Sequence, residues 1–214
     1  EIKDGDFIII VGLSGAGKST LLRTVNNLVK PSTGSVYLEG KNVTSAKKKE
    51  LKKIRSQIGM IFQTFNLVNR STVLKNVLTG RLSNISTIRS ILGLWPKDQK
   101  EMAFEALNQV EILEKAYVRA SNLSGGQQQR VGIARALSQK PKVMLADEPV
   151  ASLDPITSRV VMSYLKKINT ELGITTIVNL HFLDLAKEFG DRLIGLRDGK
   201  LVFDGNVNDV SDED

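Results

Sequence analysis

The chain has 214 residues, of which 41% are hydrophobic and 25% are charged, and its formal net charge is +7. This length supplies one sizeable core, or a core with a subordinate lobe, and excludes several independent domains. The lack of cysteine and the single histidine exclude disulfides, iron–sulfur clusters and zinc ribbons. No apolar run is long enough to cross a bilayer, and a reducing cytosolic compartment fits this composition.

The chain opens with the pattern of a strand, a glycine-rich loop and a helix. The apolar run FIIIVG at 7–12 predicts a buried strand, and KSTLLRTVNNLVK at 18–30 has helical spacing. Because Glu1 stands almost inside this strand, we expect a further segment upstream of it. Two short extended runs follow, SVYLEG at 35–40 and IGMIFQ at 58–63.

The segment between these two runs carries most of the net charge. Residues 41–55, KNVTSAKKKELKKIR, hold seven basic residues and one acidic residue, which account for six of the seven net positive charges. A lysine-rich helix of this kind is most often a solvated face. Binding to nucleic acid or to acidic lipid headgroups is the minority alternative.

Residues 64–140 contain four stretches with helical spacing and no convincing strand between them, which predicts a helical subdomain within a core made of residues 1–63 and 141–214. After this segment, strand and helix patterns alternate again. Buried parallel strands linked by crossover helices are the natural solution, so the expected fold class is α/β. The Asp-Gly step in LRDGKLVFDG at 196–205 predicts a final antiparallel hairpin.

The stretch GLSGAGKS at 12–19 matches the phosphate-loop pattern, and it lies between the predicted strand and helix as its mechanics require. The glycines allow backbone N–H groups to turn toward phosphate oxygens, Lys18 adds a positive charge, and Ser19 can ligate Mg²⁺. The residues expected to contact the nucleotide here are Gly12, Leu13, Ser14, Gly15, Ala16, Gly17, Lys18, Ser19 and Thr20.

Two adjacent acids follow the apolar strand in KVMLADEP at 142–149. Ligands of parallel sheets bind beyond the carboxyl ends of the strands, so Asp147 can hold Mg²⁺ through water and Glu148 can orient or deprotonate an attacking water. An Asp-Glu pair after a strand is, taken alone, as often a simple helix start. Together with the phosphate loop it predicts a nucleotide hydrolase site.

Two further polar residues end apolar strands. His181 follows ITTIVNL at 174–180 and should emerge at the same sheet edge as Asp147 and Glu148, where it can bond to the γ-phosphate and the water. Gln63 ends IGMIFQ, where its amide could sense Mg²⁺ or the water. Spacing alone favours a surface glutamine at that position.

A second glycine pair opens a helix in LSGGQQQR at 123–130. Ser124 is a good N-cap, and Gly125 and Gly126 leave backbone N–H groups free for an anion. The stretch lacks a lysine and an acid pair, so it can form only half of a site, and another molecule's Lys18 is the natural complement. From the residues alone, an ordinary loop and helix start remains an alternative.

LSGGQQQR resembles the signature motif of ATP-binding-cassette (ABC) ATPases. The phosphate loop, Gln63, VMLADEP, SLD at 152–154 and His181 occur in the order of that family and span nearly the whole chain. The resemblance implies a P-loop core with a helical subdomain, and ATP and Mg²⁺ as cofactors. It also implies a head-to-tail homodimer, in which Asp154 communicates between two sites. The residues that would close over the partner's ATP are Ser124, Gly125, Gly126 and Gln127.

Finer features resemble the ATPase subunits of bacterial phosphonate importers, among them RSILGLWPKDQ at 89–99, DEPVASLDP at 147–155 and the NLH step before the histidine. This resemblance implies transmembrane permease subunits as partners, an indirect link to a solute-binding protein, and a peripheral place at the cytoplasmic face of the membrane. In this scheme Glu148 is the base, His181 the γ-phosphate switch and Gln63 the link to the membrane partner.

Three alternatives stay open at this stage. An importer ATPase for amino acids or another oxyanion would share every catalytic motif. An ABC ATPase that acts on DNA would carry very long coiled coils, which this sequence lacks, so we expect no nucleic-acid partner. A small-molecule kinase would have no use for LSGGQ.

The resemblance also implies an aromatic residue upstream of Glu1 that stacks on adenine. We therefore expect this chain to bind ATP more weakly, and with less selectivity for the base, than a chain extended at its N-terminus.

Overall fold

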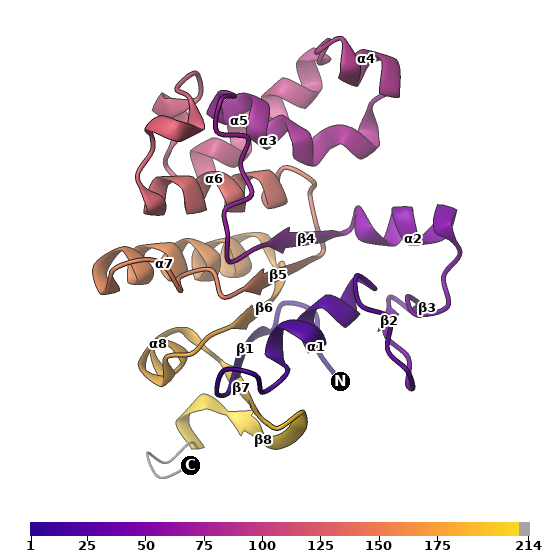
Figure 1. Cartoon of the computed structure of the whole chain (residues 1–214), viewed down its shortest axis with the longest axis vertical. Helices are drawn as coiled ribbons and strands as arrows, with labels where there is room; N and C mark the ends of the chain where they lie inside the picture. The colour runs from indigo at the N-terminus through magenta and orange to yellow at the C-terminus, as the bar shows by residue number, and fades with distance from the viewer. Residues whose placement is uncertain (210–214) are drawn as a thin grey trace.

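The computed structural model describes residues 1–209, which fold around a six-stranded sheet (Figure 1). The strand order is β4-β5-β6-β1-β7-β8. Neighbouring strands run parallel except for β7 and β8, which pair antiparallel. The strands of this sheet are β1 (Phe7–Val11), β4 (Ile58–Ile61), β5 (Val143–Asp147), β6 (Thr175–Asn179), β7 (Arg192–Arg197) and β8 (Lys200–Asn206).

The central strands are buried on both faces because they carry apolar side chains at nearly every position. In β1, Phe7 and Ile9 join one hydrophobic cluster and Ile10 joins another. Met144 and Leu145 of β5 divide between the two clusters in the same way. This alternation is the two-residue period of a strand that packs against helices on each side. The α/β fold class predicted from the sequence is confirmed.

Helices cover both faces of the sheet. Leu22 and Ile54 bring α1 and α2 into one cluster, and Leu165 and Leu185 bring α7 and α8 into the other. The helices are α1 (Lys18–Val25), α2 (Lys48–Arg55), α3 (Val73–Leu78), α4 (Thr87–Ile91), α5 (Lys97–Gln109), α6 (Gly125–Leu137), α7 (Pro155–Leu172) and α8 (Leu183–Phe189), with short 3-10 helices at Thr79–Asn84, Leu113–Lys115, Ala120–Asn122 and Val207–Asp209. Among the described residues none of these helices has the length and apolar character that a bilayer crossing requires.

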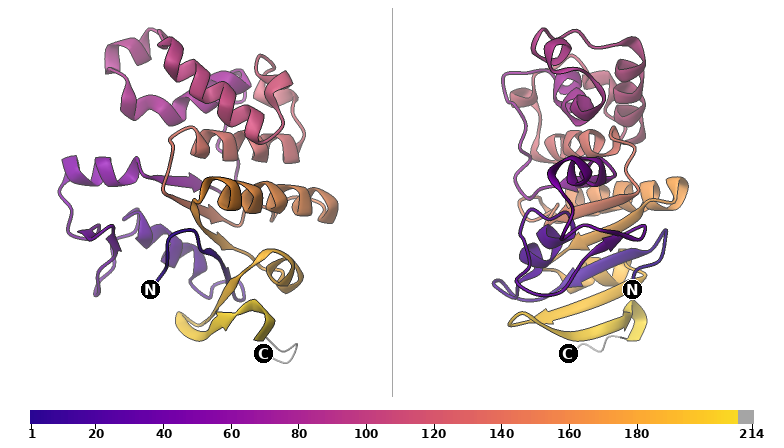
Figure 2. Two further views of the ribbon diagram at one scale, coloured as in Figure 1. Left: turned by 180° about the vertical axis from the view of Figure 1, so that it is seen from behind. Right: turned by 90° about the vertical axis from the view of Figure 1, so that its right-hand side faces the viewer.

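The segment between β4 and β5 is helical, as its spacing predicts. Helices α3, α5 and α6 pack on one another, and α6 also contacts β4. Figure 2 shows these helices beyond the β4 end of the sheet, with β8 at the opposite edge. Val77 and Leu107 belong to the same hydrophobic cluster as Ile9 of β1, so apolar packing continues from the helical segment into the sheet.

Helix α1 ends at Val25, earlier than the helical pattern at 18–30 predicts. Asn27 has a positive φ of 55°, and the N–H of Leu28 donates to the carbonyl of Arg23 at 2.9 Å. A left-handed asparagine with this hydrogen bond is a regular way to terminate a helix. The apolar residues keep helical spacing beyond Asn27, so the spacing alone does not show where the helix ends.

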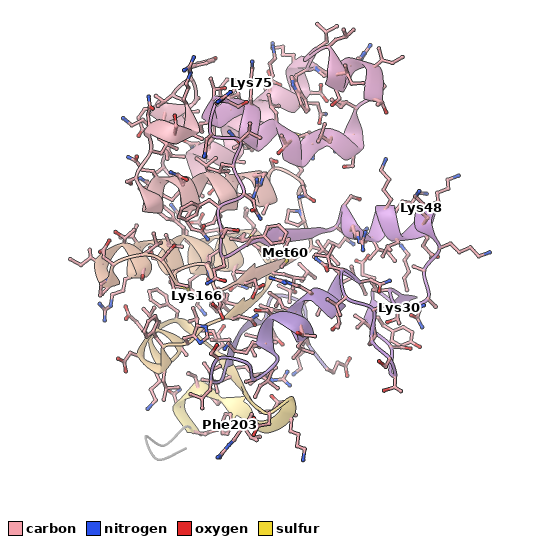
Figure 3. The ribbon with its side chains drawn as sticks, viewed as in Figure 1. Lys30, Lys48, Met60, Lys75, Lys166 and Phe203 are labelled. Carbon is pink, nitrogen blue, oxygen red and sulfur yellow. The ribbon has the colours of Figure 1, made fainter. Side chains whose placement is uncertain are left out.

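The basic segment at 41–55 is a helix only in its second half. Its first residues form β3 (Lys41–Asn42), which pairs with β2 (Tyr37–Leu38). Glu39 and Gly40 have φ of 49° and 73°, the left-handed pair that a two-residue hairpin turn requires. The remaining part, α2, carries lysines such as Lys48 that point away from the body of the molecule (Figure 3).

Candidate active site

The glycine-rich loop at 12–17 joins β1 to α1 and has a backbone that side chains would disrupt. Gly15 and Gly17 have φ of 83° and 97°. A Cβ on Gly12 would lie 2.2 Å from the carbonyl oxygen of Leu196, which is too close for any other residue. Helix α1 begins directly after Gly17 without a side-chain cap, so its first N–H groups remain available to an anion.

Lys18 folds back over this loop. Its Nζ donates to the carbonyls of Gly12 at 2.7 Å and Leu13 at 3.2 Å, and the side chain is 3% exposed. Burial lowers the pKa of Lys18, and the nearby charges of Glu148 and Asp147 act in the opposite direction. A phosphate oxygen is a stronger acceptor for an ammonium group than a carbonyl, so this lysine is placed to transfer its hydrogen bonds to a nucleotide.

Asp147, the last residue of β5, is buried and fully hydrogen-bonded. Its Oδ1 accepts from Ser19 Oγ at 2.6 Å and from Asn179 Nδ2 at 3.0 Å. Its Oδ2 accepts from Arg23 Nε at 3.2 Å and Nη2 at 2.9 Å. The hydroxyl and the carboxylate that the sequence analysis assigned to Mg²⁺ are therefore in direct contact.

Glu148, Lys18 and His181 form one polar cluster. His181 Nε2 lies 2.5 Å from Glu148 Oε1, and Lys18 Nζ lies 3.2 Å from His181 Nδ1 and 3.9 Å from Glu148 Oε1. An ammonium group can only donate, so Nδ1 must accept and the ring proton must be on Nε2, which donates to Glu148. The lysine and the glutamate also form a direct ion pair, so the imidazole contacts both partners of this pair.

The register of the sheet explains why these residues meet. Strands β1, β5 and β6 are parallel neighbours, and Asp147 is paired with Asn179 two residues before His181. The carboxyl ends of the three strands therefore lie at one edge, as expected for ligand sites in parallel sheets. The predicted meeting of His181 with Glu148 at this edge is confirmed.

The signature stretch begins α6 as expected. Ser124 is the N-cap: its Oγ accepts from the N–H of Gln127 at 3.4 Å, and Gln127 Oε1 accepts from the N–H of Ser124 at 3.0 Å. Within residues 1–209 no hydrogen bond or ion pair joins this stretch to the chain's own phosphate loop. The glycine pair that begins α6 therefore stands apart from the phosphate loop of the same chain.

The segment after Glu148 packs directly on the signature glycines. A Cβ on Gly126 would lie 2.3 Å from Thr157 Cγ2, and one on Gly125 would lie 3.2 Å from Leu153 Cδ2. Asp154 caps α7 and accepts from the N–H of Thr157 at 3.0 Å and from its Oγ1 at 2.6 Å. These bonds lower the pKa of Asp154.

Gln63 lies outside this network. It is exposed, two residues after the end of β4, and no described residue is within hydrogen-bond distance of its side chain. Because β4 is the parallel neighbour of β5, Gln63 is nevertheless at the same end of the sheet as Glu148. Its assignment to the metal and to the water stays a prediction.

Sequence comparison identifies the family. Residues 1–151 match the family model described as ABC transporter. The chain belongs to the ABC transporter family. Its relatives include the phosphonates import ATP-binding proteins PhnC of Bacillus thuringiensis and Staphylococcus epidermidis, each 60% identical over 213 residues, which are 100% of this chain and 83% of the relative. A third, PhnC 3 of Halalkalibacterium halodurans, is 57% identical over the same shares.

Solved ABC structures have the same fold. The cbiO1 protein of Clostridium perfringens, part of the ABC transporter complex cbiONQ, has a TM-score of 0.86 and 32% identity, covering 97% of this chain and 80% of that one. The ATP-binding cassette MJ0796, a dimer in a post-hydrolysis state bound to ADP and Pi, has a TM-score of 0.80 and 38% identity, covering 97% and 88%. The P-loop ATPase class predicted from the motifs is confirmed.

The residues at the ABC site fit a magnesium ion and a triphosphate. Mg²⁺ takes oxygen ligands and usually keeps several waters while it binds substrate phosphates. Ser19 Oγ and Asp147 Oδ1 supply two adjacent oxygens next to the phosphate loop. No group of three or more His, Cys, Asp or Glu within 1–209 forms a metal cage, so an ion at this position would complete its shell with phosphate and water.

Two further residues belong to this site that the sequence motifs did not predict, Arg23 and Asn179. Arg23 stands four positions after Ser19 on α1, so helical spacing places it on the same face as that serine. Asn179 is a polar residue inside the apolar run ITTIVNL and is now the cross-strand neighbour of Asp147. Each position carried a signal, but the partner of each side chain depends on the order of the strands.

Proposed function

We propose that this chain is the ATP-hydrolysing subunit of a bacterial phosphonate importer. The observation that carries the catalytic part is the meeting of the phosphate loop, Asp147, Glu148 and His181 at one sheet edge. The transported compound is proposed from kinship: the relatives that cover the whole chain at 60% identity are phosphonates import ATP-binding proteins. No residue of this chain is assigned to the phosphonate itself.

Each residue at the edge has a distinct task in this proposal. Lys18 releases the carbonyls of Gly12 and Leu13 to bind the phosphates, and Ser19 and Asp147 hold the metal, the latter through water. Mg²⁺ would supply charge neutralisation at the transferring phosphate. His181 moves its bond from Glu148 to the γ-phosphate, which frees Glu148 to accept a proton from the attacking water.

Two copies of the chain complete the site. The anion-binding start of α6 has no lysine or acid pair of its own and does not contact the phosphate loop of the same chain. A head-to-tail dimer would place Ser124, Gly125 and Gly126 of one copy over the nucleotide of the other, with Asp154 between the sites. The dimeric cassette MJ0796 supports this arrangement, since it shares 38% identity and the fold.

The helical segment at 64–140 is proposed as the subdomain that docks on the transmembrane permease. A cavity of about 400 Å³ lies where this segment meets the core, and residues of both line it, among them Met60, Leu82 and Arg135. Around α4 the segment also exposes a group of large apolar side chains, which marks a protein interaction surface. These side chains are Ile88, Ile91, Leu92 and Leu94. The chain would then act at the cytoplasmic face of the membrane, linked through the permease to a solute-binding protein.

The substitution Glu148→Gln tests the catalytic assignment. Glutamine keeps an oxygen that accepts from His181 but cannot take up a proton, so turnover should fall by roughly 100-fold or more. Affinity for ATP, measured by calorimetry, should be unchanged. Glu171→Gln, an exposed substitution near the end of α7, is the matched control. Near-normal phosphate release by the Glu148 variant would remove that residue from the role.

The substrate is tested separately. Purification of the chain from its host should recover permease and solute-binding subunits, and uptake assays with phosphonates, amino acids and other oxyanions should show phosphonate import. Uptake of an amino acid instead would contradict the proposed transported compound but would leave the ATPase assignment intact. Salt-dependent binding to DNA would favour the non-transport alternative.

A further inference from the structure

Asn179 holds an unusual position at the carboxyl end of β6. Its side chain is fully buried, and it lies beside Asp147 because the two residues are paired in the parallel register of β5 and β6. Its Nδ2 donates to Asp147 Oδ1 at 3.0 Å, the same oxygen that accepts from Ser19 Oγ. The amide thus touches the carboxylate at the atom that faces the phosphate loop.

The other end of this amide has no partner. Oδ1 of Asn179 is buried and accepts no hydrogen bond from any described residue. A buried acceptor without a donor costs stability, and an apolar side chain at this position would avoid that cost. Packing alone therefore gives no reason for an asparagine at this position, whereas its bond to Asp147 does.

The donors on Asp147 differ in how firmly they are held. Arg23 has a side chain that is 46% exposed, so its two bonds to Oδ2 can exchange with solvent. Ser19 is the residue whose oxygen would ligate the metal. Asn179 is 0% exposed on a central strand, so its hydrogen bond to Asp147 cannot exchange with solvent.

We propose that Asn179 is a positioning residue for the metal-binding carboxylate. Its Nδ2 fixes the orientation of Asp147 so that Oδ1 stays next to Ser19 Oγ whether or not the metal is bound. This inference rests on the proposed Mg²⁺–ATP site and extends it by one residue outside the ligand set.

The test measures metal affinity rather than turnover. Asn179→Leu keeps the branched shape of the side chain and removes both hydrogen-bonding groups. Asn179→Ala is a second variant in case the larger leucine does not fold. At saturating ATP, the Mg²⁺ concentration that gives half of the thermal stabilisation should rise about tenfold in either variant, since loss of a residue that orients a metal ligand costs at least that factor. ATP binding in the presence of a chelator should not change.

Asn169→Ala is the matched control, because this asparagine is also buried but donates to backbone carbonyls far from Asp147. It should lower Tm and leave the Mg²⁺ midpoint unchanged. A wild-type midpoint in the Asn179 variants would overturn the positioning role. Failure of the wild-type chain itself to respond to Mg²⁺ would instead contradict the proposed metal site.

Discussion

Glu148 has a strained backbone conformation. Its φ of 52° is left-handed, a conformation that costs a residue with a side chain about 1–3 kcal/mol. The strand β5 fixes the backbone before it, and the bond to His181 holds its carboxylate. The sequence identified Glu148 as the acid after a strand, but its contacts with Lys18 of α1 and His181 after β6 are seen only in the folded chain.

Gly126 has a packing role in addition to its proposed role at the nucleotide. Gly126→Ala should destabilise the chain by about 1–3 kcal/mol, because the new methyl would meet the Thr157 side chain. Thr157→Ser removes the methyl group responsible and should restore most of that loss in the double variant. Urea unfolding of the two single variants and the double variant measures this coupling. Simple additivity of the two changes would show that the contact does not limit packing.

At the scale of elements, local signals set where helices and hairpins begin. Ser124 and Gln127 cap α6 reciprocally, and Asp198 and Gly199 have φ of 50° and 74°, as the predicted hairpin between β7 and β8 requires. The stop of α1 at Asn27 and the turn at Gly40 were equally local signals. Helical spacing continues past Asn27, and the lysine-rich pattern at 41–55 hides the short strand that follows Gly40.

The hairpin of β7 and β8 gives a pH-dependent prediction. Arg192 donates to both carboxylate oxygens of Asp204 at 2.7 and 2.8 Å, and this pairing lowers the pKa of Asp204 from its ordinary 3.8. A depressed carboxyl pKa contributes stability that is fully present above the unfolded value and is lost as pH falls through the folded value. Asp204→Asn should therefore lose less stability than the wild type as the pH falls from about 5 to below 3.8.

Thermal unfolding of the two chains across that range checks the difference. Arg192→Gln removes the same pair from the other side and should show the same flattening. Parallel curves for wild type and variants would mean that the pair adds nothing to acid stability.

At the scale of the whole molecule, the phosphate loop and the start of α6 are two separate proposed anion-binding features on one body. The apolar cluster that includes Ile9 of β1 extends to Val77 and Leu107. Any movement of the helical segment relative to the sheet would therefore disturb this packing. The phosphate loop and the start of α6 both project from this body without touching each other. Such an arrangement suits a symmetric dimer, in which each copy completes the site of the other.

Mixing two inactive variants tests this arrangement. Lys18→Ala should abolish phosphate binding, and Gly125→Asp should place a negative charge where the partner's phosphate binds. An equal mixture should recover up to about a quarter of wild-type turnover, because half of the dimers are mixed and each of these has one intact site. Absence of recovery, or full turnover by a chain verified as monomeric in solution, would contradict a shared site.

The sequence by itself determined the motifs of this protein: the glycine-rich loop with Lys18, the acids that follow a strand, and the glycine pair that begins α6, because loops and caps depend on near neighbours in the chain. Only the tertiary structure decided which side chains meet. Asn179 and Arg23 reach Asp147, and Thr157 reaches Gly126, through strand order and helix packing, which depend on burial of apolar surface across the whole fold. Local sequence patterns specify which functional side chains are present, and long-range packing specifies which of them come into contact.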